Sequence, residues 1–330
     1  MNMLKKTSII IVTYNHINYI GNCLNSLLDE RLEIIVVDNK SNDGTPEYIE
    51  NNFPKVKLIR NKVNSGYGAG NNLGVKNSSR DYLVILNPDT KIEKYTIKNL
   101  LNPLENDRNL VIIPKILYYD GRKINTCGNK LHFTGMAFTR GNGEKPNSRN
   151  KSRFVNGLSG ACFAISKDNY LKLDGFDESI FLYMEDTELS WRIHSKGLKI
   201  IYVPESVVYH DYSFNVNSEK IYYVEKGRYM ILRKYFTIRE YFLFLPSLIM
   251  TEVLTWGYAI IGGPKSVYSK FRALYDGFSI PLNNVTIDHK ILLTQMNHKI
   301  PKLNFKFTNI YNIFRMLANF VYILNLKLIR

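Results

Sequence analysis

Short apolar runs alternate with stretches of helical spacing over the first 90 residues. Four runs are rich in Val and Ile or Leu, at residues 8–13, 33–38, 56–60 and 82–86. Helices are predicted between them, at residues 17–28, 45–52 and 66–76. Buried parallel strands have such apolar runs, and strand–helix alternation is typical of βαβ units with right-handed crossovers. The pattern predicts an α/β fold with a mostly parallel sheet.

The next hundred residues extend this pattern. We expect a helix at 92–105, strands at 111–119, 161–166 and 199–210, and a helix at 186–196. Asp120 and Gly121 are typical of the turn in a hairpin. The segment 140–153 is rich in Gly, Asn, Ser and Lys, and we expect a mobile loop there, near a site.

The pattern changes after residue 220, where helical, aromatic and basic stretches begin. Residues 241–263 are apolar except for Glu252, and Pro246 interrupts them. The stretch is long enough to span a bilayer, but a central acid and a proline count against a span. Three alternatives stay open: a pair of helices lying at the membrane interface, a helix packed against the catalytic domain, or a true span.

Charge separates the two parts of the chain. The formal net charge is +15, and residues 220–330 hold 16 Lys or Arg against five acids, which gives +11. Segments 265–277 and 309–330 are predicted to be basic, aromatic helices, as suits an anionic membrane surface. Nucleic acid also binds basic and aromatic residues, but bulky aliphatics such as Leu248 and Leu317 favour lipid or protein core. We expect a membrane surface as partner, and no nucleic acid.

Length and cysteines bound the organisation. The 330 residues exceed one average domain. We expect a catalytic domain at 1–215, with a donor half at about 1–110 and an acceptor half at about 111–215, and a helical region at 216–330. Three widely spaced cysteines form neither a disulfide framework nor a zinc pattern, which fits a reducing compartment. The apolar run at 9–12 is too short for a signal peptide, so the catalytic domain is expected in the cytoplasm.

Two acids stand where predicted strands end. Asp38 closes the run at 34–38, and Asp89 follows the run at 83–86. Either acid alone could simply start a loop. Because open α/β sheets bind ligands at the carboxyl ends of their strands, the two acids together predict a site for a polar, metal-bound ligand.

A glycine-rich stretch, Gly66-Tyr-Gly-Ala-Gly70, resembles a dinucleotide fingerprint, with Asp89 about twenty residues on. It follows the third predicted strand rather than the first, and its glycine spacing is wrong, so a dehydrogenase is not favoured. We expect instead that Gly66 and its neighbours let a helix N-terminus approach a diphosphate. The hydrogen-bond donors there would be Asn64, Asn71 and Asn72.

Five motifs in order resemble those of family 2 glycosyltransferases. They are SIIIVTYN at 8–15, VDNKSNDGT at 37–45, NSGYGAGNN at 64–72, LNPDT at 86–90, and GFDE at 175–178 with YMEDTELSWR at 183–192. The subgroup that the chain resembles most is that of rhamnosyltransferases. The resemblance implies a GT-A fold, which is Rossmann-like, and inverting transfer from a nucleoside-diphosphate sugar.

The resemblance also implies a donor site. Thr13, Tyr14 and Asn15 would line the nucleoside pocket, and Asp38 would accept a hydrogen bond from the pyrimidine ring N–H. Asp89 matches the second acid of the family's DxD motif, which binds Mg²⁺ or Mn²⁺, while Asn87 replaces its first acid. For His210, at the end of a predicted strand, a metal ligand and an ordinary packed histidine remain equal alternatives.

On the acceptor side, the resemblance makes Asp186 the general base. Glu185 would bind the acceptor or orient the loop, with Gly160, Trp191 and Arg192 completing the acceptor site. Acids at a helix start are also stabilised by the helix dipole without any catalytic role. Glu188, half a turn further on, is expected at the surface or behind the site.

These inferences predict a metal-dependent hexosyltransferase that uses a dTDP- or UDP-sugar. Its acceptor would be a hydroxyl of a polyprenyl-linked glycan, in the synthesis of a cell-surface polysaccharide or glycoprotein glycan at the cytoplasmic face of the cell membrane. The alternative is a non-catalytic sugar-nucleotide-binding subunit. Such a subunit would need Asp38 and Asp89 but not Asp186, so the motif around Asp186 favours the enzyme.

Overall fold

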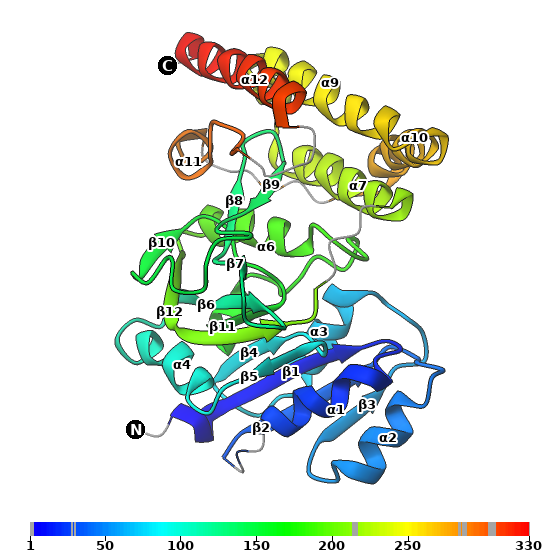
Figure 1. The fold of residues 1–330 in the computed structure, drawn as a ribbon, viewed down its shortest axis with the longest axis vertical. Coiled ribbons are helices and arrows are strands. Elements are labelled where there is room, and N and C mark those ends of the chain that lie inside the picture. Colours follow the sequence, from blue (N-terminus) through cyan, green and yellow to red (C-terminus); the bar gives the residue numbers. More distant parts are fainter. Residues whose placement is uncertain are drawn as a thin grey trace. The chain divides into compact units, whose positions relative to one another are not determined.

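The computed structural model describes residues 3–27, 29, 31–212, 217–282, 285, 289–302 and 308–329. The chain forms two compact units (Figure 1). The first unit comprises residues 1–129 and 139–214, and the second comprises residues 130–138 and 215–330. The domain boundary expected between residues 215 and 216 lies outside the described residues.

The first unit is built on a ten-stranded mixed sheet, in which four parallel strands lie in the order β3-β2-β1-β4 (Figure 1). These are β1 (Thr7–Thr13), β2 (Glu33–Asp38), β3 (Lys57–Arg60) and β4 (Tyr82–Leu86). The chain runs outward from β1 to β3 and then returns to the other side of β1. The strand order therefore reverses between β1 and β4, which is where such sheets bind ligands.

The remaining strands continue the sheet beyond β4. The antiparallel strand β11 (Cys162–Ser166) lies between β4 and β6 (Leu110–Tyr118), and β12 (Lys199–His210) runs parallel to β6. Three short strands pair at the margins: β5 (Thr90–Ile92) and β10 (Arg153–Val155) with β12, and β7 (Ile124–Thr126) with β6. The predicted α/β class with a mostly parallel core is confirmed, and the acceptor-side strands make the sheet mixed.

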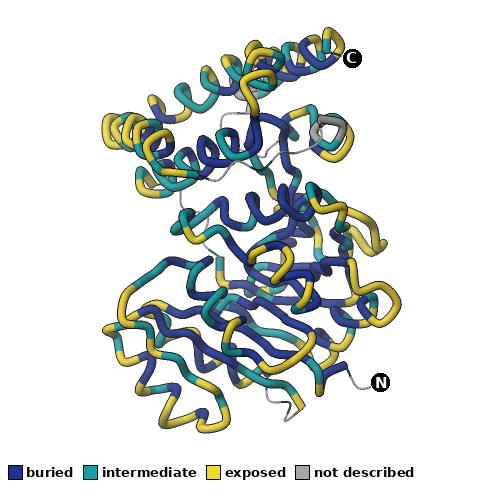
Figure 2. Tube along the Cα trace, turned by 180° about the vertical axis from the view of Figure 1, so that it is seen from behind, coloured by how far each residue is buried: buried dark blue, intermediate teal, exposed yellow. Residues whose placement is uncertain are grey.

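Helices cover both faces of this sheet because side chains alternate along each strand. Ile9 and Ile11 of β1 pack on the face covered by α1 (Ile17–Ser26), α2 (Thr45–Asn52) and α4 (Thr96–Asn106). Ile10 packs on the opposite face, which is covered by α3 (Tyr67–Lys76), α5 (Lys167–Lys172) and α6 (Glu185–Ser195). Burial follows this layering (Figure 2).

Two segments differ from the expectation. The helix predicted from residue 92 begins at Thr96, because residues 90–92 pair with β12 as β5. The segment 140–153 is tied down: the buried Lys115 ammonium donates to the carbonyls of Pro146 and Ser148 and to the side chain of Asn150. Composition predicted a free loop there, but it could not show that a lysine from β6 satisfies the loop's carbonyls.

The second unit is helical. Its elements are α7 (Ser218–Tyr235), α8 (Ile238–Leu243), α9 (Leu245–Ile261), α10 (Pro264–Ser279), α11 (His289–Gln295) and α12 (Thr308–Ile329). The tip between β8 (Asn129–Leu131) and β9 (Ala137–Thr139) belongs to it, with Phe133 packed against Phe244 and Tyr322. The apolar stretch 241–263 breaks at Phe244, and Pro246 occupies the first turn of α9, where its missing N–H costs no hydrogen bond.

Candidate active site

The first group of predicted site residues lies where β1 and β2 end. Thr13 and Asp38 are register partners in the parallel pair, and both are buried. The Asp38 carboxylate accepts hydrogen bonds from the backbone N–H and the hydroxyl of Ser41, at 2.9 and 2.5 Å. The Thr13 hydroxyl is buried without a hydrogen-bond partner in the described structure. Parallel pairing thus brings together two polar groups that lie 25 residues apart in the chain.

The neighbouring positions are more open. Tyr14 is 44% exposed, and Asn15 adopts a left-handed conformation with φ of 58°. The Asn15 amide oxygen accepts from the backbone N–H of Asn42, which ties the end of β1 to the loop after β2. His16 follows, and burial lowers its pKa even though Asp89, Asp43 and Asp38 act in the opposite direction. A histidine near three acids of this edge was missed in the sequence, because no motif marks it.

A second group forms where β4 ends, and strand pairing assembles it. β5 pairs with the last residues of β12, Thr90 opposite His210, so His210 lies beside Asp89. The distance from His210 Nε2 to Asp89 Oδ1 is 3.2 Å. Asn87 Oδ1 is buried without a hydrogen-bond partner in the described structure, whereas the buried Asp89 Oδ1 has His210 beside it. A buried oxygen atom without a partner requires an explanation, and a bound cation supplies one for Asn87.

This donor set fits a divalent cation. Carboxylate and amide oxygens suit Mg²⁺ or Mn²⁺, whereas an imidazole nitrogen is a ligand typical of transition metals rather than of Mg²⁺. The described residues contain no group of three or more His, Cys, Asp or Glu side chains that could hold a metal on their own. A cation here would therefore need further ligands, as when it is shared with a bound diphosphate.

The third group is the acid pair that opens α6. Glu185 and Asp186 begin the helix directly after Tyr183 and Met184, which both have positive φ, at 58° and 65°. Non-glycine residues in this conformation are uncommon and cluster at functional sites. Asp186 Oδ2 accepts from the backbone N–H of Gly160 at 3.1 Å. The Asn129 amide group also donates to it, at 3.4 Å.

The two acids of this pair perturb each other. Burial and the neighbouring Asp186 raise the pKa of Glu185 to about 8. Burial also raises the pKa of Asp186, against the effect of the hydrogen bond from Gly160. Two close carboxyl groups in a poorly solvated place cannot both ionise easily, so the pair retains a proton near neutral pH. A raised pKa is what a general base that works near neutral pH requires.

A short backbone segment links the second and third groups. The carbonyl of Ala161 accepts from the backbone N–H of Asn87, while the N–H of the preceding Gly160 holds Asp186. The buried Tyr67 hydroxyl donates to the Gly160 carbonyl at 2.7 Å. Tyr67 and Asn129 are site residues that the sequence did not reveal, because one stands inside a glycine run and the other in a stretch without a pattern.

The helix α3 corrects one expectation. The space beside its glycines is occupied by other parts of the protein rather than left open for a diphosphate. A Cβ on Gly66 would stand 2.4 Å from the carbonyl oxygen of Phe181, and a Cβ on Gly74 would stand 2.4 Å from Ile10 Cγ2. The Asn72 amide oxygen accepts from the Tyr170 hydroxyl and the Phe176 N–H, and its NH₂ group donates to the Phe176 carbonyl and the Glu178 carboxylate.

The other two asparagines of this stretch also have protein partners. Asn64 accepts from the N–H of Gly66, and the Asn71 amide group donates to the Tyr67 carbonyl. This stretch therefore packs the helix against the sheet and the 176–181 loop.

Burial corrects a second expectation. Trp191 is completely buried, and Arg192 forms a buried ion pair with Glu188 at 2.5 Å, four residues earlier in α6. Arg192 also donates to the Leu173 carbonyl. These side chains are buried in the core, which does not fit the acceptor-binding role predicted for Trp191 and Arg192. Of the two positions expected for Glu188, its burial excludes the surface and leaves the position behind the site. The motif identified α6 but not which of its faces is buried.

The fold and the acids at its edge define the GT-A class of α/β proteins. Residues 8–173 match glycosyl transferase family 2, and the chain belongs to this family.

Several relatives are glycosyltransferases by name. The low-salt glycan biosynthesis hexosyltransferase Agl10 of Haloferax volcanii is 28% identical over 60% of this chain and 64% of its own length. The N-acetylglucosaminyl-diphospho-decaprenol L-rhamnosyltransferase of Mycobacterium tuberculosis is 25% identical over 61% of this chain and 75% of its own length. The rhamnosyltransferase WbbL of Escherichia coli is 26% identical over 59% of this chain and 80% of its own length.

Solved structures share the fold. The structure of GalNAc-T7 with UDP, GalNAc and Mn²⁺ has a TM-score of 0.59 and 19% identity, over 82% of this chain and 55% of the other. The mannosyltransferase PcManGT from Pyrobaculum calidifontis, solved with GDP-Man and Mn²⁺, has a TM-score of 0.54 and 14% identity, over 97% of this chain and 86% of the other. At these identities the likeness concerns the fold.

Removing Arg192 should destabilise the first unit strongly. Arg192→Met leaves the Glu188 carboxylate buried without its cation, and we expect a loss of about 3–5 kcal/mol in the free energy of unfolding, measured with denaturant. The control is Arg108→Met, whose partner Asp168 lies 3.5 Å away in an exposed pair, with an expected change within about 0.5 kcal/mol. Equal effects of the two substitutions would contradict the structural role of Arg192.

The raised pKa of Glu185 should appear in the pH dependence of stability. Its pKa rises from an ordinary value of 4.5 to about 8 in the folded protein, so the folded state binds more protons between these values. Stability therefore falls as pH rises through this window. Relative to Glu185→Gln, the wild type should lose unfolding free energy between pH 5 and pH 9. Glu105→Gln, at an exposed position, controls for the loss of a carboxyl group, and parallel pH curves for wild type and Glu185→Gln would refute the assignment.

Proposed function

We propose that this protein is an inverting glycosyltransferase that moves a hexosyl residue from a dTDP- or UDP-sugar to a hydroxyl group of a glycan acceptor. The observation that carries the proposal is the Gly160–Ala161 segment, which hydrogen-bonds both Asn87 of the donor side and Asp186. Membership of glycosyl transferase family 2 and relatives named as hexosyl- and rhamnosyltransferases support it.

Asp186 acts as the general base in this mechanism. Its carboxylate accepts the proton of the acceptor hydroxyl as that oxygen forms a bond to the anomeric carbon. The bond from the anomeric carbon to the diphosphate oxygen breaks on the opposite face, and the nucleoside diphosphate leaves with the electron pair. Glu185, with its raised pKa, retains its proton near neutral pH and leaves the negative charge on Asp186. The hydrogen bond from Gly160 orients the Asp186 carboxylate.

On the donor side, Asp38 accepts from the ring N–H of the pyrimidine base, and Thr13, Tyr14 and Asn15 surround the nucleoside. Asp89 and His210, with the side-chain amide oxygen of Asn87, would hold Mg²⁺ or Mn²⁺. Such a cation supplies electrostatic stabilisation of the charge that develops on the leaving diphosphate. Mn²⁺ is present in the structures of GalNAc-T7 and PcManGT, which supports a divalent cation here.

The acceptor is a lipid-linked glycan in cell-surface glycan synthesis, and the reaction takes place at the cytoplasmic face of the cell membrane. The support is the Mycobacterium relative, whose name specifies a diphospho-decaprenol acceptor. The basic charge of residues 220–330 is also suited to a membrane surface.

Substituting the base should abolish transfer while preserving donor binding. Asp186→Asn keeps an oxygen to accept from Gly160 but cannot take a proton, so we expect turnover to fall by about 10²–10⁴-fold. Transfer and nucleotide binding would be measured with a panel of dTDP- and UDP-sugars, with Mn²⁺ and lipid acceptors. Asp168→Asn, at a side chain 69% exposed, is the matched control. Wild-type turnover in Asp186→Asn would disprove the assigned base, and binding without turnover by the wild type would favour a non-catalytic subunit.

The metal assignment predicts a loss of coupling between cation and nucleotide. In the wild type, Mn²⁺ should tighten nucleoside-diphosphate binding, measured by calorimetry with and without the cation. Asp89→Asn and His210→Gln should each reduce this tightening by about tenfold or more, because each removes a proposed ligand of the cation. Nucleotide affinity without Mn²⁺ should change little. Unchanged tightening in both variants would contradict the proposed site.

A further inference from the structure

Helix α9 has its polarity reversed with respect to a helix of a water-soluble protein. The side chains of Ser247, Thr251 and Ala259 are buried, although they are small or polar. The exposed large side chains are apolar or aromatic, and four of them recur at intervals of four or seven residues: Leu245, Ile249, Val253 and Ile260, with Tyr258 and Ile261 also exposed near the end of the helix. Such spacing places them on one side of the helix.

The same reversal occurs in α10 and α12. Buried and exposed positions alternate along these helices (Figure 2). In α10 the buried residues are Ser266, Lys270, Ala273 and Gly277, whereas Tyr268, Phe271, Tyr275 and Phe278 are 52–74% exposed. In α12 the buried positions include Ala318, Asn319, Tyr322 and Asn325, and the exposed apolar residues are Ile313, Phe314, Met316, Leu317, Phe320, Leu324 and Leu328. We call the exposed apolar residues of α9, α10 and α12 the apolar face.

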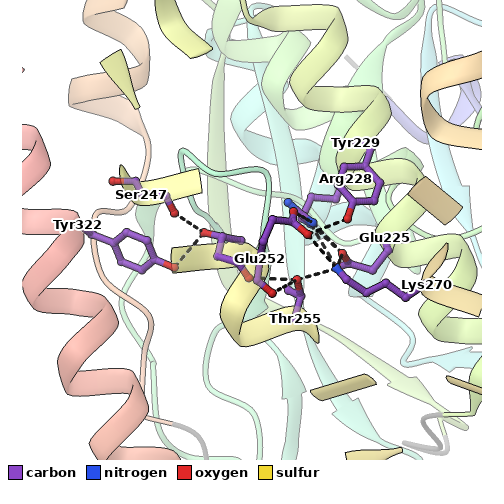
Figure 3. Close-up of polar contacts among 9 residues, drawn as sticks. Glu225, Arg228, Tyr229, Ser247, Glu252, Thr255, Lys270 and Tyr322 are labelled. Carbon is purple, nitrogen blue, oxygen red and sulfur yellow. Dashed lines mark hydrogen bonds and ion pairs between the residues drawn. The ribbon is translucent and has the colours of Figure 1, made fainter. Parts of the chain in front are cut away.

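A polar network fills the inside of this unit (Figure 3). Glu252 of α9 pairs with Arg228 of α7 at 2.5 Å and with Lys270 of α10 at 3.4 Å. Glu225 binds the same two cations, so two acids and two bases balance each other.

Hydrogen bonds extend this network to α12. The Ser247 hydroxyl donates to Asn325, and the Thr251 hydroxyl lies 2.9 Å from that of Tyr322. Paired polar groups thus lie between α7, α9, α10 and α12, beside buried apolar residues such as Ile231 and Phe244, while many large apolar side chains of α9, α10 and α12 are exposed.

This arrangement is typical of protein surrounded by lipid. In water, apolar residues turn inward, and contiguous exposed apolar areas mark an interaction surface. In lipid, small and polar residues form the helix contacts and apolar residues face outward. We propose that the apolar face inserts into one leaflet of an anionic bilayer. The proposal deepens the proposed function by naming the surface that reaches the membrane of a lipid-linked acceptor, and it rests on that function for the acceptor only.

Charge spacing favours insertion into one leaflet over a span. Among the described residues, Asn312–Ile329 is the one helical stretch long and apolar enough to cross a membrane. However, Arg315 and Lys327 lie twelve residues apart, which is about 18 Å along a helix and short of the roughly 30 Å hydrocarbon core. Helix α9 is also shorter than a typical span, and Glu252 stands near its middle. Helices of this kind lie in the plane of the interface.

Charge complementarity selects an anionic surface. Residues 220–330 hold 16 Lys or Arg and five acids. Glu225 and Glu252 are paired inside the unit, and Asp276 is bound by Tyr222 and Arg272. Lys265 and Lys327 are exposed on α10 and α12. Basic groups close to the apolar face are positioned to contact anionic headgroups.

The test is flotation of the full chain with vesicles, without donor or acceptor. The vesicles are phosphatidylcholine alone, or phosphatidylcholine with phosphatidylglycerol. Wild type should float with the mixed vesicles and at least about tenfold less with the neutral ones. Replacing Tyr268 and Tyr275 of the apolar face with Ser should reduce binding to mixed vesicles by about tenfold or more. The control variant replaces Tyr95 and Phe154 of the first unit with Ser. These side chains are 59% and 56% exposed, and the variant should float like wild type.

Each outcome decides the proposal. Flotation that the α10 variant loses and the control keeps supports it, provided the variants have the wild-type unfolding midpoint. Failure of the wild type to float would overturn it, as would an α10 variant that floats normally. A stable dimer that the α10 substitutions dissociate, without any flotation, would assign the apolar face to a second copy of the chain instead. Because Asp186→Asn should float like wild type, a failure of catalysis and a failure of docking are distinguishable.

Discussion

The antiparallel pairing of β4 with β11 is the contact on which the site depends. A purely parallel extension would put another carboxyl end beside β4. The reversed strand instead puts its amino end there, so Gly160 and Ala161 lie next to Asn87. Their backbone groups then reach the donor side and Asp186 together. The five paired positions of β4 and β11 thus place Asn87 and Asp186 on neighbouring backbone groups, although almost a hundred residues separate them in the sequence.

The two units differ in the residues that they bury between their elements and expose at the surface. In the first unit Ile, Val and Leu fill both faces of the sheet, and polar groups gather at its carboxyl edge. In the second unit, carboxylates, cations and hydroxyls meet between helices beside a smaller apolar core, and α9, α10 and α12 also expose many large apolar residues. One chain containing both patterns suits a protein that binds a charged, water-soluble donor and an acceptor held at a membrane. The ion network also favours the observed orientation of α9, because Glu252 contacts both Arg228 and Lys270 on the inner side of this helix.

The positions of most strands and helices in the first unit were predictable because the spacing of apolar residues is a local signal. The acids at the ends of β2 and β4 were predictable for the same reason, since each stands at or just after the end of an apolar run. Asp38, Asp89 and Asp186 follow from motifs, whereas Tyr67, Asn129 and His16 depend on contacts across the fold that no local pattern encodes. The burial of Trp191 and Arg192 depends on which side of α6 faces the sheet, and a helix with polar residues at most positions does not reveal that side. The lack of a side chain at Gly66 leaves room for Phe181, a contact across the fold that the local motif does not encode.

The central claim is a single displacement at the anomeric carbon with Asp186 as the only base. The most direct test is the anomeric configuration of the product, determined by NMR from a reaction with a donor of known configuration. One displacement predicts a glycosidic bond of configuration opposite to that of the donor. A product that retains the donor's configuration would require a different mechanism and would contradict the role assigned to Asp186.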